Sequence, residues 1–269
     1  MPAPRYSVSL ALIALILGGC ASSANTPAAG SPSSQPSATA AGLVIRYEES
    51  AQFELALPSG RHVYIDVSDA SAIEKQPTAD DVLLTTVGLP HHYDSAFADS
   101  FPGQKIVVAK SEITLPELHV SSFLTSGDGT PIDPARPVNS MMVIEAAGLR
   151  VLACGDEDQE ALTAEQIAAI GGPIDVAMCP LMNVGGSADP TGRKMLNVID
   201  QIGPKILLPT HISVDVARKA MTEWSANFAA KPAITVRRGT LPATTTMLFL
   251  GDQAANYGAV LDLTPTNDW

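Results

Sequence analysis

The sequence is poor in basic residues. It holds 16 Lys and Arg against 28 Asp and Glu, which gives a formal net charge of −12 at pH 7. The basic residues are scattered along the chain, whereas binding to a nucleic-acid backbone requires them to cluster. We therefore do not expect nucleic acid as a partner.

Cysteine is also scarce, with three residues in the whole chain. Two of them, Cys154 and Cys179, each lie near the end of an expected buried strand. A free cysteine packs as a small apolar residue, so two buried free thiols are the simpler interpretation. In an oxidising compartment the two could instead form a disulfide, and this alternative stays open.

The N-terminal apolar stretch is too short to span a bilayer. It covers residues 8–17 after Arg5, whereas a transmembrane helix needs about 20 apolar residues. A short apolar run after a positive charge is typical of a signal peptide. The "LGGC" that ends at Cys20 resembles a bacterial lipobox, in which this cysteine is acylated and becomes the first mature residue. Ordinary cleavage further along, with loss of Cys20, is the alternative.

The segment after the cysteine contains little except Ser, Ala, Pro, Gly and Thr. Such a composition offers too few large apolar groups to offset the entropy of ordering the chain. We therefore expect a lipoprotein signal peptide over residues 1–19, a tether over 20–42 and a folded domain over 43–269. Because Ala21 rather than Asp follows the cysteine, the lipoprotein pattern implies an outer membrane anchor facing the periplasm. The lipid would then be the protein's membrane contact.

The folded region reads as strands first and as alternating strands and helices later. Strands are expected at residues 44–47, 52–57, 62–67, 82–85, 105–109, 118–124, 141–156 with a turn at 147–148, and 173–180. Helices are expected after the cap residue Thr163, within residues 189–203 and over 213–228, and strands return at 233–238 and 244–250. This order predicts an α/β domain of layered sheets and helices.

Several stretches, in this order, are similar to the metallo-β-lactamase superfamily, in particular to its lactonase-like branch of metal-dependent hydrolases. They are "VYIDV" with Asp66, "ADDVLLT", "NSMMVIEAAGLRVLACGD", "LTAEQIAAIGGPIDVAMCPL" and "IGPKILLPTHIS". The resemblance covers residues 43–250. It implies a four-layer αββα sandwich, in which two mixed β-sheets are flanked by helices.

The family's metal-binding loop, H-x-H-x-D-H, falls on "TTVGLPHHYDSAF". There the resemblance assigns His92 and Asp94 to ligand positions. The leading and closing histidines of the family loop are replaced by Pro90 and Ser95.

The resemblance also assigns the remaining ligands. Asp156 matches the family's bridging Asp and His211 its final His, whereas a further His falls near Thr125 and is absent. Of the first metal site only His92 remains, so that site is expected to be empty. The second site keeps Asp94, Asp156 and His211, which fits one divalent ion with an open position, either Zn, Mn or Fe.

The resemblance thus implies a hydrolase acting on a small ester, lactone or phosphoester through at most one metal, with Asp94 or Asp156 orienting the water. The alternative is a catalytically inactive member that binds a ligand or protein in the periplasm. Each of these residues could instead have a purely structural role. Asp94 could cap a helix that starts at Ser95. Asp156 begins an acidic loop, and His211 could hydrogen-bond neighbouring backbone.

Overall fold

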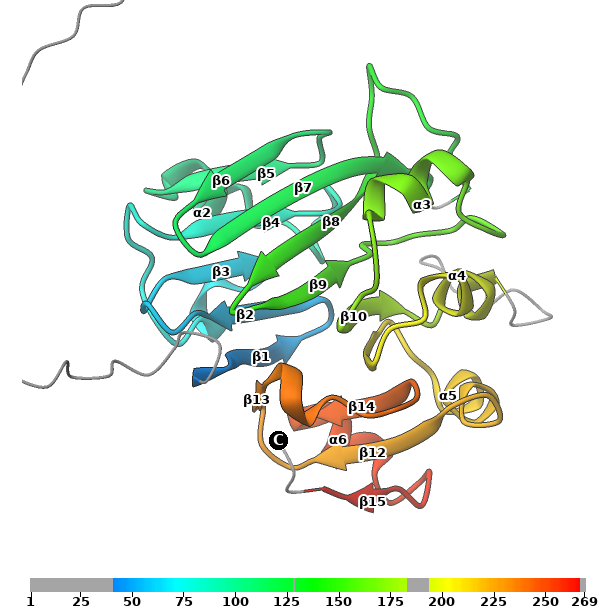
Figure 1. Cartoon of the computed structure of the whole chain (residues 1–269). Coiled ribbons are helices and arrows are strands. Elements are labelled where there is room, and N and C mark those ends of the chain that lie inside the picture. Colours follow the sequence, from blue (N-terminus) through cyan, green and yellow to red (C-terminus); the bar gives the residue numbers. More distant parts are fainter. Residues whose placement is uncertain (1–40, 128, 183–193, 267–269) are drawn as a thin grey trace, which may run out of the picture. The chain divides into compact units, whose positions relative to one another are not determined.

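The computed structural model describes residues 41–127, 129–182 and 194–266, and within them two mixed β-sheets form the core of the fold (Figure 1). The six-stranded sheet has the order β13-β1-β2-β3-β4-β5. Its strands are β1 (Leu43–Glu49), β2 (Gln52–Ala56), β3 (His62–Ile65), β4 (Val82–Thr85), β5 (Gln104–Val107) and β13 (Ala233–Val236). β3, β4 and β5 run parallel to one another, and the other pairs are antiparallel.

The nine-stranded sheet has the order β15-β12-β14-β11-β10-β9-β8-β7-β6. Its strands are β6 (Glu112–Leu115), β7 (Leu118–Thr125), β8 (Asn139–Ala146), β9 (Leu149–Ala153), β10 (Val176–Pro180), β11 (Ile206–Thr210), β12 (Ser225–Ala229), β14 (Thr246–Leu250) and β15 (Thr264–Pro265). β6 to β9 form an antiparallel meander. From β9 onward the neighbouring strands of this sheet, β9, β10, β11, β14, β12 and β15, pair in parallel.

The apolar pattern of the strands explains why the two sheets pack together. In β1, for example, Leu43, Ile45 and Tyr47 are buried and alternate with half-buried residues, which is the period of a strand. These side chains share one core cluster with residues of the other sheet, including Ile144 and Val176. Burial of this inner layer is the main source of the fold's stability.

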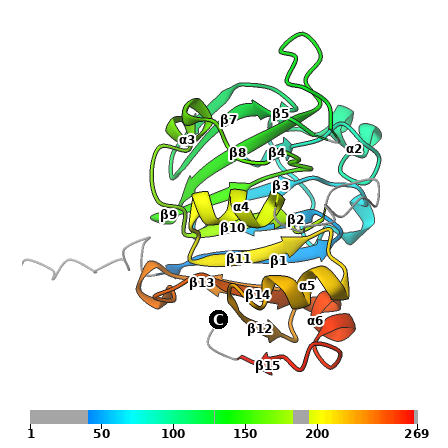
Figure 2. The ribbon, with the colours of Figure 1, turned by 90° about the vertical axis from the view of Figure 1, so that its right-hand side faces the viewer.

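Helices cover both outer faces. They are α2 (Ser95–Ser100), α3 (Ala164–Ile170), α4 (Lys194–Ile202), α5 (Val214–Ala220) and α6 (Gly251–Tyr257). Figure 2 shows α3, α4 and α5 in front of the nine-stranded sheet, and their buried residues share a second core with it. On the six-stranded sheet, Ala98 of α2 packs with Tyr64 and Leu83. The layers are helix, sheet, sheet and helix, which confirms the expected αββα sandwich.

The signal peptide, Cys20 and the tether up to residue 40 lie outside the described residues, as does the expected start of the helix at residues 189–193. Among the residues that the structure describes, no helix combines the length and apolar character needed to cross a membrane. The lipoprotein prediction therefore stays a prediction.

The expected helix over residues 213–228 is wrong in its second half. Ser213 caps α5, which ends after Ala220, and Ser225–Ala229 form strand β12 beside β14. The apolar positions Met221 and Trp224 do pack against the second core, as the helical spacing suggested. Residues 225–229 nevertheless form a strand, because pairing with β14 satisfies their backbone hydrogen bonds.

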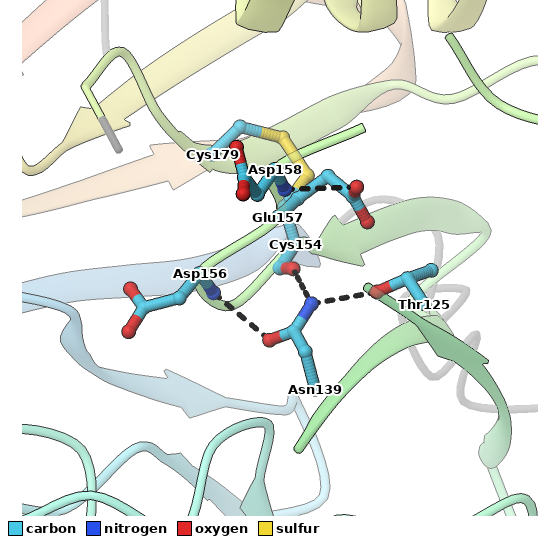
Figure 3. Close-up of a disulfide and its surroundings, with 7 residues drawn as sticks. All are labelled: Thr125, Asn139, Cys154, Asp156, Glu157, Asp158 and Cys179. Atoms are coloured by element: carbon cyan, nitrogen blue, oxygen red, sulfur yellow. Dashed lines mark hydrogen bonds between the residues drawn. A yellow bond between two sulfur atoms is a disulfide. The ribbon is translucent and has the colours of Figure 1, made fainter. Parts of the chain in front are cut away.

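The expectation of two free thiols is also wrong, because Cys154 and Cys179 form a disulfide (Figure 3). Cys154 follows β9 directly, and its amide donates to the carbonyl of Met178 in the neighbouring parallel strand β10 (3.0 Å). This register brings the two Cα atoms to 4.9 Å, within the range that a disulfide needs. The sequence pattern places the cysteines near strand ends but does not reveal that the two strands are neighbours.

Removal of this disulfide should lower the free energy of unfolding by about 3 kcal/mol, because the bond closes a loop with a sequence separation of 25 residues. We expect the double variant Cys154→Ala/Cys179→Ala to unfold at a correspondingly lower guanidinium concentration than the oxidised protein. A reductant should shift the midpoint of the parent protein and leave that of the double variant unchanged. Equal midpoints for the parent and the variant would contradict the expectation.

Stability should fall as the pH rises from about 4.5 to about 7 because of Glu48 in β1. Burial raises the pKa of Glu48 from 4.5 to about 7, although Arg46 opposes the shift. The folded protein therefore binds more protons than the unfolded chain between these pH values, so the free energy of unfolding decreases over this range by about 1–2 kcal/mol after allowance for partial exposure. We expect Glu48→Gln to remove this decrease and to be more stable than the parent at pH 8. The exposed neighbour provides the control, and Glu49→Gln should keep the parent's pH profile in thermal unfolding.

Candidate metal centre

Four side chains able to bind a metal gather where strands of both sheets end. His91 and His92 lie in the loop after β4, Asp156 follows β9, and His211 follows β11. One ligand atom from each lies within 4.8 Å of every other. The carboxyl ends of these strands meet at one edge of the sandwich, which brings together residues far apart in the sequence.

Three of these residues form a tight triangle of ligand atoms. The Nε2 atom of His92 lies 3.0 Å from Oδ1 of Asp156 and 3.0 Å from Nε2 of His211. Nε2 of His211 lies 3.2 Å from the same carboxylate oxygen. His92 is fully buried and Asp156 nearly so, whereas the side chain of His211 is 19% exposed. His92 and Asp156 therefore lie in the core, and His211 is the corner of the triangle that faces solvent.

His91 contacts the other oxygen of the same carboxylate. Its Nε2 atom lies 3.2 Å from Oδ2 of Asp156, and its side chain is 38% exposed. The two oxygens of Asp156 thus face different partners. Oδ1 faces His92 and His211, and Oδ2 faces the more exposed His91.

Asp66, at the end of β3, orients His92 by contacting the imidazole on the side opposite the centre. Its Oδ2 atom lies 2.9 Å from Nδ1 of His92, and its two oxygens accept hydrogen bonds from the amide and hydroxyl of Thr86 (2.7 and 2.6 Å). A carboxylate on Nδ1 fixes the imidazole so that Nε2 points at the centre, which is the usual support for a metal-binding histidine. Asp66 and His211 both have positive φ angles, 50° and 40°. Such backbone strain in non-glycine residues is typical of functional sites.

Asn139, the first residue of β8, holds Asp156 in place (Figure 3). Its Oδ1 atom accepts from the amide of Asp156 (2.9 Å), and its Nδ2 atom donates to the Thr125 hydroxyl (2.6 Å) and the Cys154 carbonyl (3.2 Å). The approach requires Gly155, since a Cβ atom there would lie 2.2 Å from Oδ1 of Asn139. This asparagine therefore ties the turn that carries Asp156 to two strands.

The electrostatics of the metal-free centre favour a positive charge between the carboxylates. Burial by itself lowers the pKa of His92, but Asp66 and Asp156 outweigh it and raise this pKa to about 10. Burial acts to raise the pKa of Asp156, but His211 and His92 outweigh it and hold this pKa well below its ordinary value. The two carboxylates that stabilise a positive charge on His92 would likewise stabilise a metal cation.

The ligand atoms also fit a metal ion by geometry. Atoms that bind one ion at about 2.0–2.2 Å lie about 3.0–3.5 Å apart, which matches the triangle of His92, Asp156 and His211. Two histidines and one carboxylate on one side of an ion are a ligand set of zinc and iron enzymes. The fit is to a single ion, because all the ligand atoms lie so close together.

The structure changes the ligand set that the resemblance implied. It brings His92, Asp156 and His211 together, so His92 lies with the other two rather than in a separate, empty site. It does not bring in Asp94, whose carboxylate accepts from the Phe97 amide (3.0 Å) as the N-cap of α2. The set is therefore rich in nitrogen rather than oxygen.

Sequence reasoning missed the role of three neighbours. For His91 the signal in the sequence is the adjacent pair of histidines, which is compatible with two ligands in one turn. The amide of His92 bonds to the carbonyl of Leu89 (2.8 Å), and this turn presents both imidazoles to the centre. Asp66 and Asn139 lie in motifs of the family resemblance, and no pattern in the sequence shows that they hold His92 and Asp156.

Comparison with known proteins shows the family of the chain. Residues 44–211 match the profile of the family described as "Beta-lactamase superfamily domain". The chain belongs to the metallo-β-lactamase superfamily. No curated protein gives a significant match to the chain.

Solved structures of the metallo-β-lactamase fold resemble the chain over most of its length. A candidate zinc-dependent hydrolase of this superfamily from Thermotoga maritima has a TM-score of 0.54 and 20% identity, covering 77% of this chain and 99% of its own. A candidate metal-dependent hydrolase from Parabacteroides distasonis has a TM-score of 0.51 and 16% identity, covering 67% and 89%. At these identities the likeness shows the metallo-β-lactamase fold.

A third structure similar to the chain is named as another class of enzyme. The E377D mutant of CmlA β-hydroxylase has a TM-score of 0.52 and 11% identity, covering 77% of this chain and 52% of its own. The superfamily fold therefore does not by itself define the reaction, and the function must be argued from the residues of the centre.

Proposed function

We propose that this member of the superfamily is a metal-dependent hydrolase that acts on a small ester, lactone or phosphoester through one divalent ion. His92, Asp156 and His211 would hold the ion, and the triangle of their ligand atoms is the observation that carries the proposal. A bound ion of this kind lowers the pKa of a water molecule and polarises the ester oxygen. Zinc and iron suit two imidazoles and a carboxylate, and manganese remains a candidate.

The chain's own residues supply the proton transfers. Oδ2 of Asp156 faces His91 and can orient the attacking water by accepting a hydrogen bond from it. His91, beside this oxygen and partly exposed, can take the proton of that water and pass it to the leaving group. The water oxygen forms a bond to the acyl or phosphoryl centre, the ester bond breaks, and the leaving oxygen takes the proton.

Metal binding and turnover by the full chain test this proposal. After treatment with a chelator, the protein should take up one equivalent of zinc or manganese in calorimetry and elemental analysis. A panel of p-nitrophenyl esters, lactones and phosphodiesters should then show turnover that depends on the ion. His91→Gln should keep the ion while reducing turnover and altering its pH profile. The absence of a bound ion, or a bound ion without turnover of any substrate, contradicts the proposal.

A non-catalytic role is the second candidate, and the completeness of the hydrogen-bond network favours it. His92 is satisfied between Asp66 and Asp156 without any ion. A protein of this kind would bind a ligand or partner protein in the periplasm. The metal titration separates the two candidates, because a purely structural network takes up no stoichiometric ion.

We also propose that the protein is a lipoprotein of the bacterial cell envelope, anchored through Cys20 in the outer membrane and facing the periplasm. The support is the N-terminal sequence alone, an apolar run followed by "LGGC" and a tether. Cell fractionation tests it, since Cys20→Ala should move the protein from the membrane to the soluble fraction. An unchanged membrane fraction for this variant contradicts acylation at Cys20.

A further inference from the structure

A cavity of about 240 Å³ opens beside the metal centre, and its walls are mostly apolar. It lies between the loop after β4 and the segment that leads into β8. Apart from two glycines, it is lined by Val87, Leu89, Thr130, Pro137, Val138 and Asp156. Leu89 is one of the few large apolar side chains of the described residues that remain exposed, at 39%.

The cavity and the centre share Asp156. A molecule in the cavity therefore lies against a residue of the centre, the one whose carboxylate faces all three histidines. The apolar walls are tied to the same framework, because Val87 bridges to Asn139, which also holds the amide of Asp156. The cavity thus adjoins the centre.

The charge of the lining selects against an anionic substrate. Among the described residues that line the cavity, Asp156 is the charged one, and none is Lys or Arg. The lysine at the start of α4, Lys194, directs its amino group to Asp158 (3.2 Å). Sites that recognise phosphate groups place arginine, lysine or helix amides on the anion. This cavity instead presents four apolar side chains and one hydroxyl.

We propose, building on the hydrolase function above, that the substrate is an uncharged ester or lactone whose aliphatic acyl part occupies this cavity. A substrate with a charged group in the part that occupies the cavity is disfavoured, because that group would face apolar walls. At about 30 Å³ for each heavy atom, the cavity admits an acyl group of about eight heavy atoms. Leu89 and Val138 contact the aliphatic chain, and the ester carbonyl lies toward Asp156.

Ligand binding to the metal-free protein tests the inference apart from turnover. The probes are hexanamide, an uncharged acyl group that resists hydrolysis, and butyl phosphate, an anion of similar size. Binding is measured by saturation-transfer NMR and titration with the full chain after chelator treatment. We expect hexanamide to bind at least tenfold more tightly than butyl phosphate.

A pair of matched variants locates the bound acyl group. Leu89→Lys places a charge at the cavity, and Val260→Lys places the same charge on another exposed apolar residue that does not line it. We expect Leu89→Lys to weaken hexanamide binding at least tenfold with metal uptake unchanged, and Val260→Lys to change neither. The inference is overturned if hexanamide does not bind, if butyl phosphate binds equally or more tightly, or if the two variants have equal effects. Failure of the chain to take up an ion contradicts the hydrolase proposal and does not affect this binding result.

Discussion

Replacement of Asp156 by asparagine should reduce the affinity of the protein for zinc by more than about 100-fold. Asp156 faces His91, His92 and His211, so it links every ligand of the proposed centre. Asparagine keeps the shape of the side chain but removes the charge, and a neutral amide is a poor zinc ligand. The loss should exceed the 10–100-fold decrease that is typical of substitutions behind the ligands. Calorimetric titration with zinc measures it.

The same substitution at Asp94 provides the matched control. Asp94→Asn keeps a residue that caps helices as well as aspartate does, so both the stability of α2 and the zinc affinity should match the parent. This pair distinguishes the ligand set of the structure from the set that the family resemblance implied. A large loss of zinc affinity in Asp94→Asn, or none in Asp156→Asn, would restore the earlier ligand set.

The secondary structure and the α/β class could be predicted from the sequence because their signals are local, whereas the four-layer sandwich was implied by the resemblance to the superfamily. Alternation of buried residues marks β1, the turn at Ala147 and Gly148 marks the hairpin of β8 and β9, and the Thr163 cap marks the start of α3. Each of these signals comes from residues that are close together in the sequence, and the folded structure contains the element that each signal predicts. The strand β12 could not be predicted, because residues 225–229 become a strand through their pairing with β14.

The centre was predicted only in part, because ligand geometry depends on how a loop turns. Asp156 and His211 follow strands, so the strand ends fix their positions closely. His92 and Asp94 lie in the same loop, where a turn of one residue decides which side chain points inward. The structure turns His91 and His92 to the centre and uses Asp94 to begin a helix. A spacing pattern cannot distinguish these two arrangements.

Asn139 should have a large effect on both stability and zinc affinity although it is not itself a ligand. Asn139→Ala leaves the buried amide of Asp156, the carbonyl of Cys154 and the hydroxyl of Thr125 without this partner, which should lower the free energy of unfolding by about 3–5 kcal/mol. Zinc affinity should fall about 10–100-fold, because the turn that carries Asp156 is no longer held.

A substitution on the other side of this asparagine separates positioning from general loss of stability. Thr125→Val removes one hydrogen bond of Asn139 and keeps its bond to Asp156, so stability should fall by about 1 kcal/mol with zinc affinity close to that of the parent. Urea unfolding and zinc titration of both variants provide the measurements. If zinc affinity falls in proportion to stability in both, Asn139 acts through the stability of the fold. A fall confined to Asn139→Ala shows that the asparagine positions the carboxylate.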